Sequence, residues 1–139
     1  MAVQGVGHVG YHLCKELSAH GARLSVADVD PLTGRGVPFR RRHRLYGPFA
    51  LYGGRVERDN GCEEMLEYFD AYAAADGDTS LVLMGVKMMK VPEERYLRMA
   101  GVLPDRERMV AYEAADVTLA PAPGDLLSQS VLESLAVGT

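Results

Sequence analysis

Apolar and polar positions alternate along the chain with two distinct periods. Short apolar runs bounded by glycine, proline or polar residues predict β-strands at residues 2–6, 24–29, 49–53, 80–84, 96–100 and 117–120. Between these runs, apolar positions recur three or four residues apart and predict helices, one ending at Gly21 and others over residues 61–75, 105–115 and 126–137. Strands that alternate with helices predict a mostly parallel sheet covered on both faces. We therefore expect an α/β fold.

The segment between the second and third predicted strands differs from its surroundings. Pro31, Gly34 and Pro38 interrupt a loop, and a basic run, RRRHR, occupies residues 40–44. Such a run suggests nucleic-acid binding, but it carries no interleaved aromatic residues, and the chain as a whole is acidic. We interpret it as a helical turn of a connector whose arginines are solvated.

The composition is that of one ordinary globular domain. The chain has 139 residues, of which 47% are hydrophobic and 24% charged. Its net charge of −4 gives no general attraction to nucleic acid or to an anionic membrane. We expect a single domain over residues 1–139, divided into an N-terminal strand–helix–strand unit (1–30), a connector (31–47) and a second half (48–139).

Nothing in the sequence indicates export, membrane insertion or metal binding. No apolar run approaches the roughly 20 residues of a membrane span, and the N-terminus lacks a signal-peptide pattern. Cys14 and Cys62 have neither CxxC nor metal-ligand spacing, so we expect reduced thiols in a cytoplasmic protein. His8 and His12 share a helix face, but ordinary exposed helix positions explain them better than a ligand pair does. We therefore predict no metal site.

Residues 5–10, GVGHVG, join the first predicted strand to the first helix. Gly5 permits a tight turn, Gly7 lets the backbone approach a pyrophosphate, and Gly10 lets the helix pack close to the strand. The helix N-terminus favours phosphate, and the acid about 20 residues later, Asp28, favours a ribose hydroxyl, hence NAD over NADP. The alternative is that the glycines serve only helix–strand packing. The candidate cofactor-binding residues, for weak NAD or phosphate binding, are Gly5, Gly7, His8, Val9, Gly10 and Asp28.

The whole N-terminal segment, MAVQGVGHVGYHLCKELSAHGARLSVADVD, resembles the start of the NAD domain of the leucine, phenylalanine and glutamate dehydrogenases. His8 departs from the asparagine expected in that family. The resemblance places the catalytic lysines and aspartate in a substrate domain that precedes this segment. Because the chain starts at Met1 directly on the strand, we expect it not to oxidise amino acids by itself, whatever the glycines bind.

Two later segments resemble a different family. They are FRRRHRLYGPFALYGGRVERDNGCEEMLEYFDAYAAADGDTSLVLMG and AADVTLAPAPGDLLSQSVLESLAVGT, and both are similar to the donor-binding domain of retaining GT-B glycosyltransferases. The resemblance implies a nucleotide-sugar site, in which Asn60 replaces a lysine that contacts the diphosphate. Losing that cation removes a contact worth about 1.5–3 kcal/mol. The implied site residues are Gly54, Arg55, Lys87 as a partial substitute cation, Asp125 and Glu133.

These two resemblances lead to three hypotheses. The first is a non-catalytic chimera, joined by design or recombination, that acts as a Rossmann-like scaffold with weak nucleotide binding. The second is a nucleotide-sugar glycosyltransferase fragment, although Arg55 and Glu133 could also be surface ion-pair residues. The third is an NAD-binding fragment of an amino-acid dehydrogenase. The expected partner is a small nucleotide or a phosphate. The alternative is a second copy of the chain, in a homodimer formed through an exposed sheet edge. We expect no binding to nucleic acid or to a membrane.

Joining the two parts predicts the topology of the domain. The expected fold is a three-layer sandwich around a six-stranded sheet of order 5-4-3-6-1-2, because the N-terminal unit then covers the apolar edge of the strand at 117–120. Ligands in such sheets bind where the strand order reverses, here between the strands at 49–53 and 117–120. The glycine turn is expected one strand away from that point.

Overall fold

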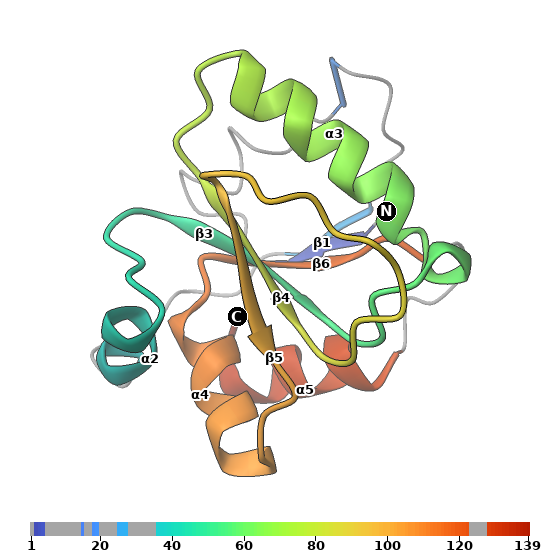
Figure 1. Cartoon of the computed structure of the whole chain (residues 1–139). Coiled ribbons are helices and arrows are strands. Elements are labelled where there is room, and N and C mark those ends of the chain that lie inside the picture. The colour runs from blue at the N-terminus through green and yellow to red at the C-terminus, as the bar shows by residue number, and fades with distance from the viewer. Residues whose placement is uncertain (1, 5–14, 16–17, 20–24, 28–35, 123–127) are drawn as a thin grey trace.

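A computed structural model describes residues 2–4, 15, 18–19, 25–27, 36–122 and 128–139 (Figure 1). Of the helix expected before Gly21, only Lys15, Ser18 and Ala19 are described, and these three are helical. The elements in chain order are β1 (Ala2–Gln4), β2 (Ser25–Ala27), α2 (Val37–Arg42), β3 (Phe49–Gly53), the 3-10 helix η1 (Arg58–Asn60), α3 (Cys62–Ala74), β4 (Ser80–Met84), β5 (Leu97–Gly101), α4 (Asp105–Ala114), β6 (Val117–Ala120) and α5 (Gln129–Val137).

Four of the strands form a parallel sheet in the order β5-β4-β3-β6. Every residue of β3 and of β6 is buried, as are four consecutive residues of β4, Leu81 to Met84. Strands of a parallel sheet lie between two helical layers, which explains why the sequence shows them as continuous apolar runs. The structure confirms the α/β class with a Rossmann-like parallel sheet.

The two N-terminal strands continue this sheet beyond β6, giving the order β2-β1-β6-β3-β4-β5. β1 pairs parallel with β2 but antiparallel with β6, so that Gln4 lies opposite Thr118 and Ala2 opposite Ala120. The carboxyl end of β1 therefore lies at the edge of the sheet opposite to the carboxyl ends of β3 and β6. The glycine turn at residues 5–10, which was expected one strand away from the reversal of strand order, lies outside the described part of the chain.

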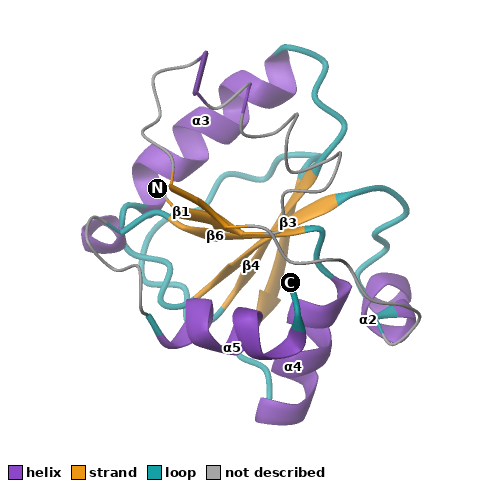
Figure 2. Cartoon of the chain, turned by 180° about the vertical axis from the view of Figure 1, so that it is seen from behind, coloured by secondary structure: helices purple, strands orange, loops and turns teal. Residues whose placement is uncertain are grey.

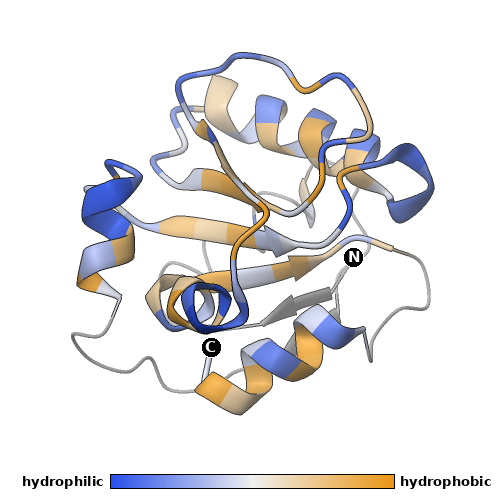
Figure 3. Ribbon diagram, turned by 60° about the horizontal axis from the view of Figure 1, so that its bottom comes forward, coloured by the Kyte–Doolittle hydropathy of each residue, from blue (hydrophilic) through white to orange (hydrophobic). Residues whose placement is uncertain are grey.

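Helices cover both faces of the sheet (Figures 1 and 2). On one face, α3 packs Met65 and Phe69 against Leu81 and Leu83 of β4. On the other face, α4 and α5 lie side by side, and Tyr112 of α4 belongs to the core cluster that includes β3 and β4 residues. Figure 3 shows hydrophobic central strands, whereas hydrophilic and hydrophobic positions alternate along α3. This alternation is the pattern from which the helix was predicted.

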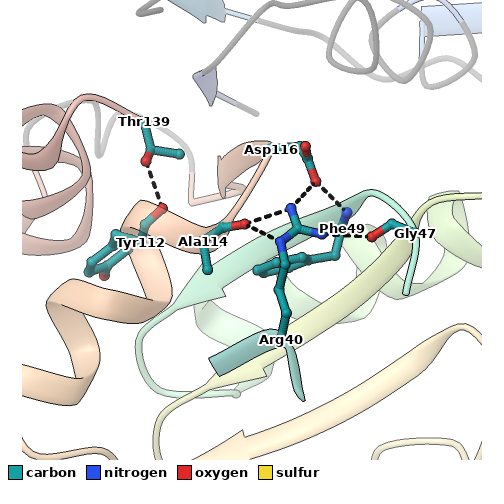
Figure 4. A network of polar contacts seen from close by, with 7 residues as sticks. All are labelled: Arg40, Gly47, Phe49, Tyr112, Ala114, Asp116 and Thr139. Atoms are coloured by element: carbon teal, nitrogen blue, oxygen red, sulfur yellow. Dashed lines mark hydrogen bonds and ion pairs between the residues drawn. The ribbon is translucent and has the colours of Figure 1, made fainter. Parts of the chain in front are cut away.

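Arg40 of the basic run is a structural residue (Figure 4). Its Nε and Nη2 donate to the carbonyl of Ala114 at 3.1 and 2.7 Å, and Nη2 also meets Asp116 Oδ2 at 2.8 Å. Its Nη1 donates to the carbonyl of Gly47 at 2.8 Å, and the guanidinium lies 4.8 Å from the centre of the Phe49 ring. The interpretation of the run as solvated arginines is therefore wrong for Arg40, which joins α2 to the ends of α4 and β3.

Candidate ligand-binding cavity

A cavity of about 370 Å³ opens at the carboxyl ends of β3, β4 and β6. Its position coincides with the reversal of strand order between β3 and β6, where open α/β sheets bind ligands. The volume falls within the range of small-molecule sites, roughly 300–1,000 Å³. The polar groups in its wall come from Arg55, Asn60, Arg108, Ser128, Gln129, Ser130 and Glu133, and from Tyr52 and Tyr112.

Two glycines that follow β3 and β4 shape the edge of this cavity. Gly54 and Gly85 have φ angles of +151° and +142°, which side chains of L-residues rarely adopt. A Cβ on Gly85 would collide with the carbonyl oxygen of Gly54, so the two turns can approach this closely only because residue 85 has no side chain. The backbone hydrogen bond from Gly54 N to Met84 O, 2.9 Å, then extends the strand pairing into the cavity wall.

The main chain at Arg55 is held in place by neighbouring side chains. Its carbonyl oxygen accepts hydrogen bonds from Tyr52 Oη at 2.7 Å and from Asn60 Nδ2 at 3.1 Å, and Cys62 Sγ lies 3.8 Å away. Burial and the neighbouring Cys62 raise the pKa of Tyr52, so its hydroxyl remains a donor at all ordinary pH values. Asn60 therefore supports the loop from the position where the glycosyltransferase resemblance expects a lysine.

The Arg55 side chain itself is largely exposed. It is 67% accessible, and its nearest carboxylate contact is 3.8 Å, from Nη1 to Glu57 Oε1. Exposed pairs of this length contribute little free energy, so the guanidinium can turn toward a ligand at small cost. The Arg55 backbone is fixed while its side chain is exposed. The guanidinium therefore places one positive charge at the cavity mouth.

Arg108 and Glu133 form a bidentate ion pair in the cavity wall. Arg108 Nε donates to Oε2 at 2.8 Å, and Nη2 donates to Oε1 at 2.7 Å. Gln129 Nε2 adds a third bond to Oε1 at 2.7 Å. The Glu133 carboxylate raises the pKa of Arg108, so the guanidinium stays charged. This pair joins α4 to α5 across 25 residues of sequence, and no local spacing in the sequence points to it.

Buried hydroxyl groups fix α5 beside the cavity. Ser134, which is fully buried, is hydrogen-bonded to Thr118 Oγ1 and to the carbonyl of Thr139, each at 2.9 Å. Thr139 Oγ1 donates to the carbonyl of Tyr112 at 2.6 Å. At the other end of the helix, Ser128 Oγ accepts from the amide of Val131 at 3.4 Å and serves as the N-cap. These contacts direct the first turn of α5 toward the cavity.

The structure brings three of the sequence-predicted nucleotide-sugar residues to this cavity: Gly54, Arg55 and Glu133. Lys87 is not among the lining residues; it forms an isolated β-bridge with Val56 and borders a separate depression beside β5. The remaining predicted residues lie outside the described part of the chain, namely Asp125 and the six dinucleotide-site positions Gly5, Gly7, His8, Val9, Gly10 and Asp28.

Features typical of metal sites and membrane spans do not occur in the described residues. These residues contain no group of three or more histidine, cysteine, aspartate or glutamate side chains placed to hold a metal ion. Within the same part of the chain, Cys62 is a free, buried cysteine, and no helix is both long and apolar enough to cross a bilayer.

Comparison with known proteins finds short segments similar to amino-acid dehydrogenases. No family model matches the chain. A leucine dehydrogenase of Bacillus cereus is 63% identical over 30 residues, which are 22% of this chain and 8% of that enzyme. The leucine dehydrogenase of Geobacillus stearothermophilus is 57% identical over 30 residues, with the same coverage. An L-tryptophan dehydrogenase of Nostoc punctiforme is 45% identical over 47 residues, or 34% of this chain and 12% of the enzyme. The chain thus spans a small fraction of the length of these relatives.

Proposed function

We propose that this chain binds NAD through its N-terminal strand–helix–strand unit, as an NAD-binding fragment of the amino-acid dehydrogenase type. The observation that carries the proposal is the 63% identity over 30 residues to a leucine dehydrogenase, a length equal to that of the predicted unit. The full glycine fingerprint of residues 5–10 and the acid at position 28 supply the chemistry.

The proposed roles follow from what a dinucleotide requires. The amides of the glycine turn contact the pyrophosphate, with Gly7 allowing the close approach, and Asp28 accepts a ribose hydroxyl. Asp28 also repels a 2′-phosphate, so NAD binds more tightly than NADP. His8 and Val9 stand where the sequence predicts the start of a helix, and in this proposal the N-terminus of that helix binds the phosphates. The affinity is weak, because contacts to phosphate without an enclosing apolar pocket leave much of the ligand in water.

Calorimetric titration of NAD and NADP into matched glycine variants tests this proposal. Gly7→Val should abolish NAD binding, because the side chain blocks the approach of the pyrophosphate. Gly47→Val is the control, since a Cβ there meets only the carbonyl of Asp78 at 3.9 Å. At 100 times its dissociation constant, NAD should stabilise the parent chain by about 2.7 kcal/mol. Equal NAD binding by the Gly7 variant and the parent would show that the glycines only pack the helix.

A second candidate function belongs to the cavity. The specific observation in its favour is that Gly54, Arg55 and Glu133, which the glycosyltransferase resemblance singles out, lie together in one cavity at the strand-order reversal. We assign to it the binding of a phosphorylated nucleotide-type ligand, with Arg55 as the phosphate-binding cation. In this account, the chain combines two nucleotide-binding parts in one sheet of order 5-4-3-6-1-2, with their sites at opposite edges.

Titration with nucleoside diphosphates and nucleotide sugars tests the cavity. Arg55→Gln should weaken binding about tenfold or more, the loss expected for a charge-assisted hydrogen bond. Arg58→Gln is the matched control, because Arg58 is 73% exposed, pairs with Glu63 at 3.5 Å and does not line the cavity. An equal loss in both variants would indicate a general charge effect and not a site.

A further inference from the structure

Glu133 is the only carboxylate among the described residues that line the cavity, and its charge is already matched. The bidentate contact with Arg108 engages both of its oxygens, and Gln129 adds a bond to one of them. The side chains of Arg108 and Glu133 are 26% and 16% exposed. Bidentate arginine–carboxylate pairs of this kind are strong and fix geometry as well as charge.

The pair sets the balance of charge among the described residues that line the cavity. With Arg108 in place, the charged lining groups among the described residues are Arg55, Arg108 and Glu133, which leaves an excess of one positive charge. Asp105, the other partner of Arg108 at 3.1 Å, is 91% exposed and does not line the cavity. Without Arg108, the largely buried Glu133 carboxylate would face the cavity with Gln129 as its remaining partner, and it would repel an anion.

We propose that Arg108 is a specificity-determining residue, which makes this cavity select phosphate-bearing ligands over neutral polyhydroxyl ligands. Its guanidinium cancels the repulsion that Glu133 would exert on phosphate. It also occupies the oxygens that would otherwise accept hydroxyl groups of a sugar or ribose. A neutral nucleoside therefore gains a contact with Glu133 only by competing with Arg108. This inference rests on the second candidate function, the binding of a phosphorylated ligand in the cavity.

A purely structural role for Arg108, as a staple between α4 and α5, makes a different prediction. If Arg108 only joins the two helices, its removal lowers stability and weakens the binding of every ligand to the same degree. A specificity residue changes the ratio of affinities for charged and neutral ligands. Arg108→Gln removes the charge, whereas Arg108→Lys keeps the charge but loses the bidentate fork. Arg58→Gln again supplies a matched loss of one positive charge outside the cavity.

The experiment titrates inorganic pyrophosphate and adenosine into these variants by calorimetry. All variants carry Gly7→Val, so that the glycine turn contributes no pyrophosphate signal. We expect Arg108→Gln to weaken the binding of pyrophosphate about tenfold or more, and to leave the affinity for adenosine unchanged or higher. Arg108→Lys should keep most of the affinity for pyrophosphate. Adenosine binding that appears only in Arg108→Gln would also support the proposal.

Several results would overturn the proposal. Unchanged affinities in Arg108→Gln, or an equal loss for both ligands, would leave Arg108 as a staple. An equal loss of pyrophosphate affinity in Arg58→Gln would indicate a long-range effect of net charge and not a site. If Arg108→Gln does not fold, Arg108→Lys decides, and loss of pyrophosphate binding with that charge retained would contradict the proposal. If neither the chain that retains Arg108 nor the Arg108→Gln variant binds either ligand, the cavity function itself fails, and the inference with it.

Discussion

Arg40 links three segments that are distant in the sequence, and its contacts account for much of the packing of α2. The guanidinium reaches two carbonyl groups and Asp116, and both side chains of the ion pair are less than a third exposed, at 28% and 29%. Asp116 Oδ2 also accepts from the amide of Phe49 at 2.8 Å, so the carboxylate fixes the start of β3.

Replacing Arg40 should therefore destabilise the chain. We expect Arg40→Met to lower the free energy of unfolding by about 2–3 kcal/mol, because the partly buried carbonyl of Ala114 and the Asp116 carboxylate lose their donor. Arg42→Met is the control, since its pair with Glu107 joins side chains that are 64% and 45% exposed, and it should cost at most about 1 kcal/mol. Urea unfolding measures both, and equal losses would refute the structural role of Arg40.

His43 should make stability depend on pH. Burial lowers the pKa of His43 below 6.5, the adjacent Arg42 lowers it further, and Glu107 opposes them. Its Nε2 is buried and has no hydrogen-bond partner among the described residues. A group with a depressed folded-state pKa binds protons more readily when unfolded, so its contribution is present above about pH 6.5 and is lost as the pH falls below it. The parent should lose more stability than His43→Gln between pH 7.5 and 5.5; parallel curves would contradict this.

Arg108 shows the limit of residue-level prediction. The sequence indicated Arg55 and Glu133 by their resemblance to a motif, and the structure places both at one cavity. The partner of Glu133 was missed, because an ion pair between two helices depends on how those helices pack. Lys87 borders a separate depression beside β5, so its role as a substitute cation stays a prediction. Motif residues were thus predictable, whereas their partners required tertiary structure.

At the scale of elements, the apolar runs gave the central strands correctly. The bounds predicted for β3, β4 and β6 equal those observed, because each strand is buried on both faces and its run is uninterrupted. The predicted final helix began at residue 126, whereas α5 begins at Gln129 after the Ser128 N-cap. The antiparallel direction of β1 was not predictable, since a three-residue strand carries no local signal for the direction of its partner.

The docking of α5 provides a test at this scale. Ser134→Ala should cost about 1–3 kcal/mol, because it leaves the buried Thr118 hydroxyl and the carbonyl of Thr139 without a bond. Adding Thr118→Val should recover part of that loss, since removing both partners of a buried bond is nearly neutral. A double-mutant cycle from urea unfolding measures the coupling, and strictly additive effects would show that the Ser134–Thr118 bond contributes nothing.

At the scale of the whole molecule, the pairing of β1 with β6 joins the N-terminal unit to the rest of the sheet. Neither part alone covers its apolar strand edges, so we expect the chain to unfold as one cooperative unit. Far-ultraviolet circular dichroism and tyrosine fluorescence should give coincident urea transitions; the chain has seven tyrosines and no tryptophan. Two separated transitions would mean that the halves fold independently.

The most direct test of NAD binding is an amide NMR titration of the isotope-labelled chain with NAD. The account predicts that the signals of Gly5, Gly7, Gly10 and Asp28 shift with one dissociation constant, while those of Gly54 and Arg55 stay in place. This separation follows because β1 runs antiparallel to β6, so its carboxyl end and the cavity lie at opposite edges of the sheet. Shifts confined to Gly54, Arg55 and their neighbours, or no shifts at all, would contradict NAD binding by the N-terminal unit.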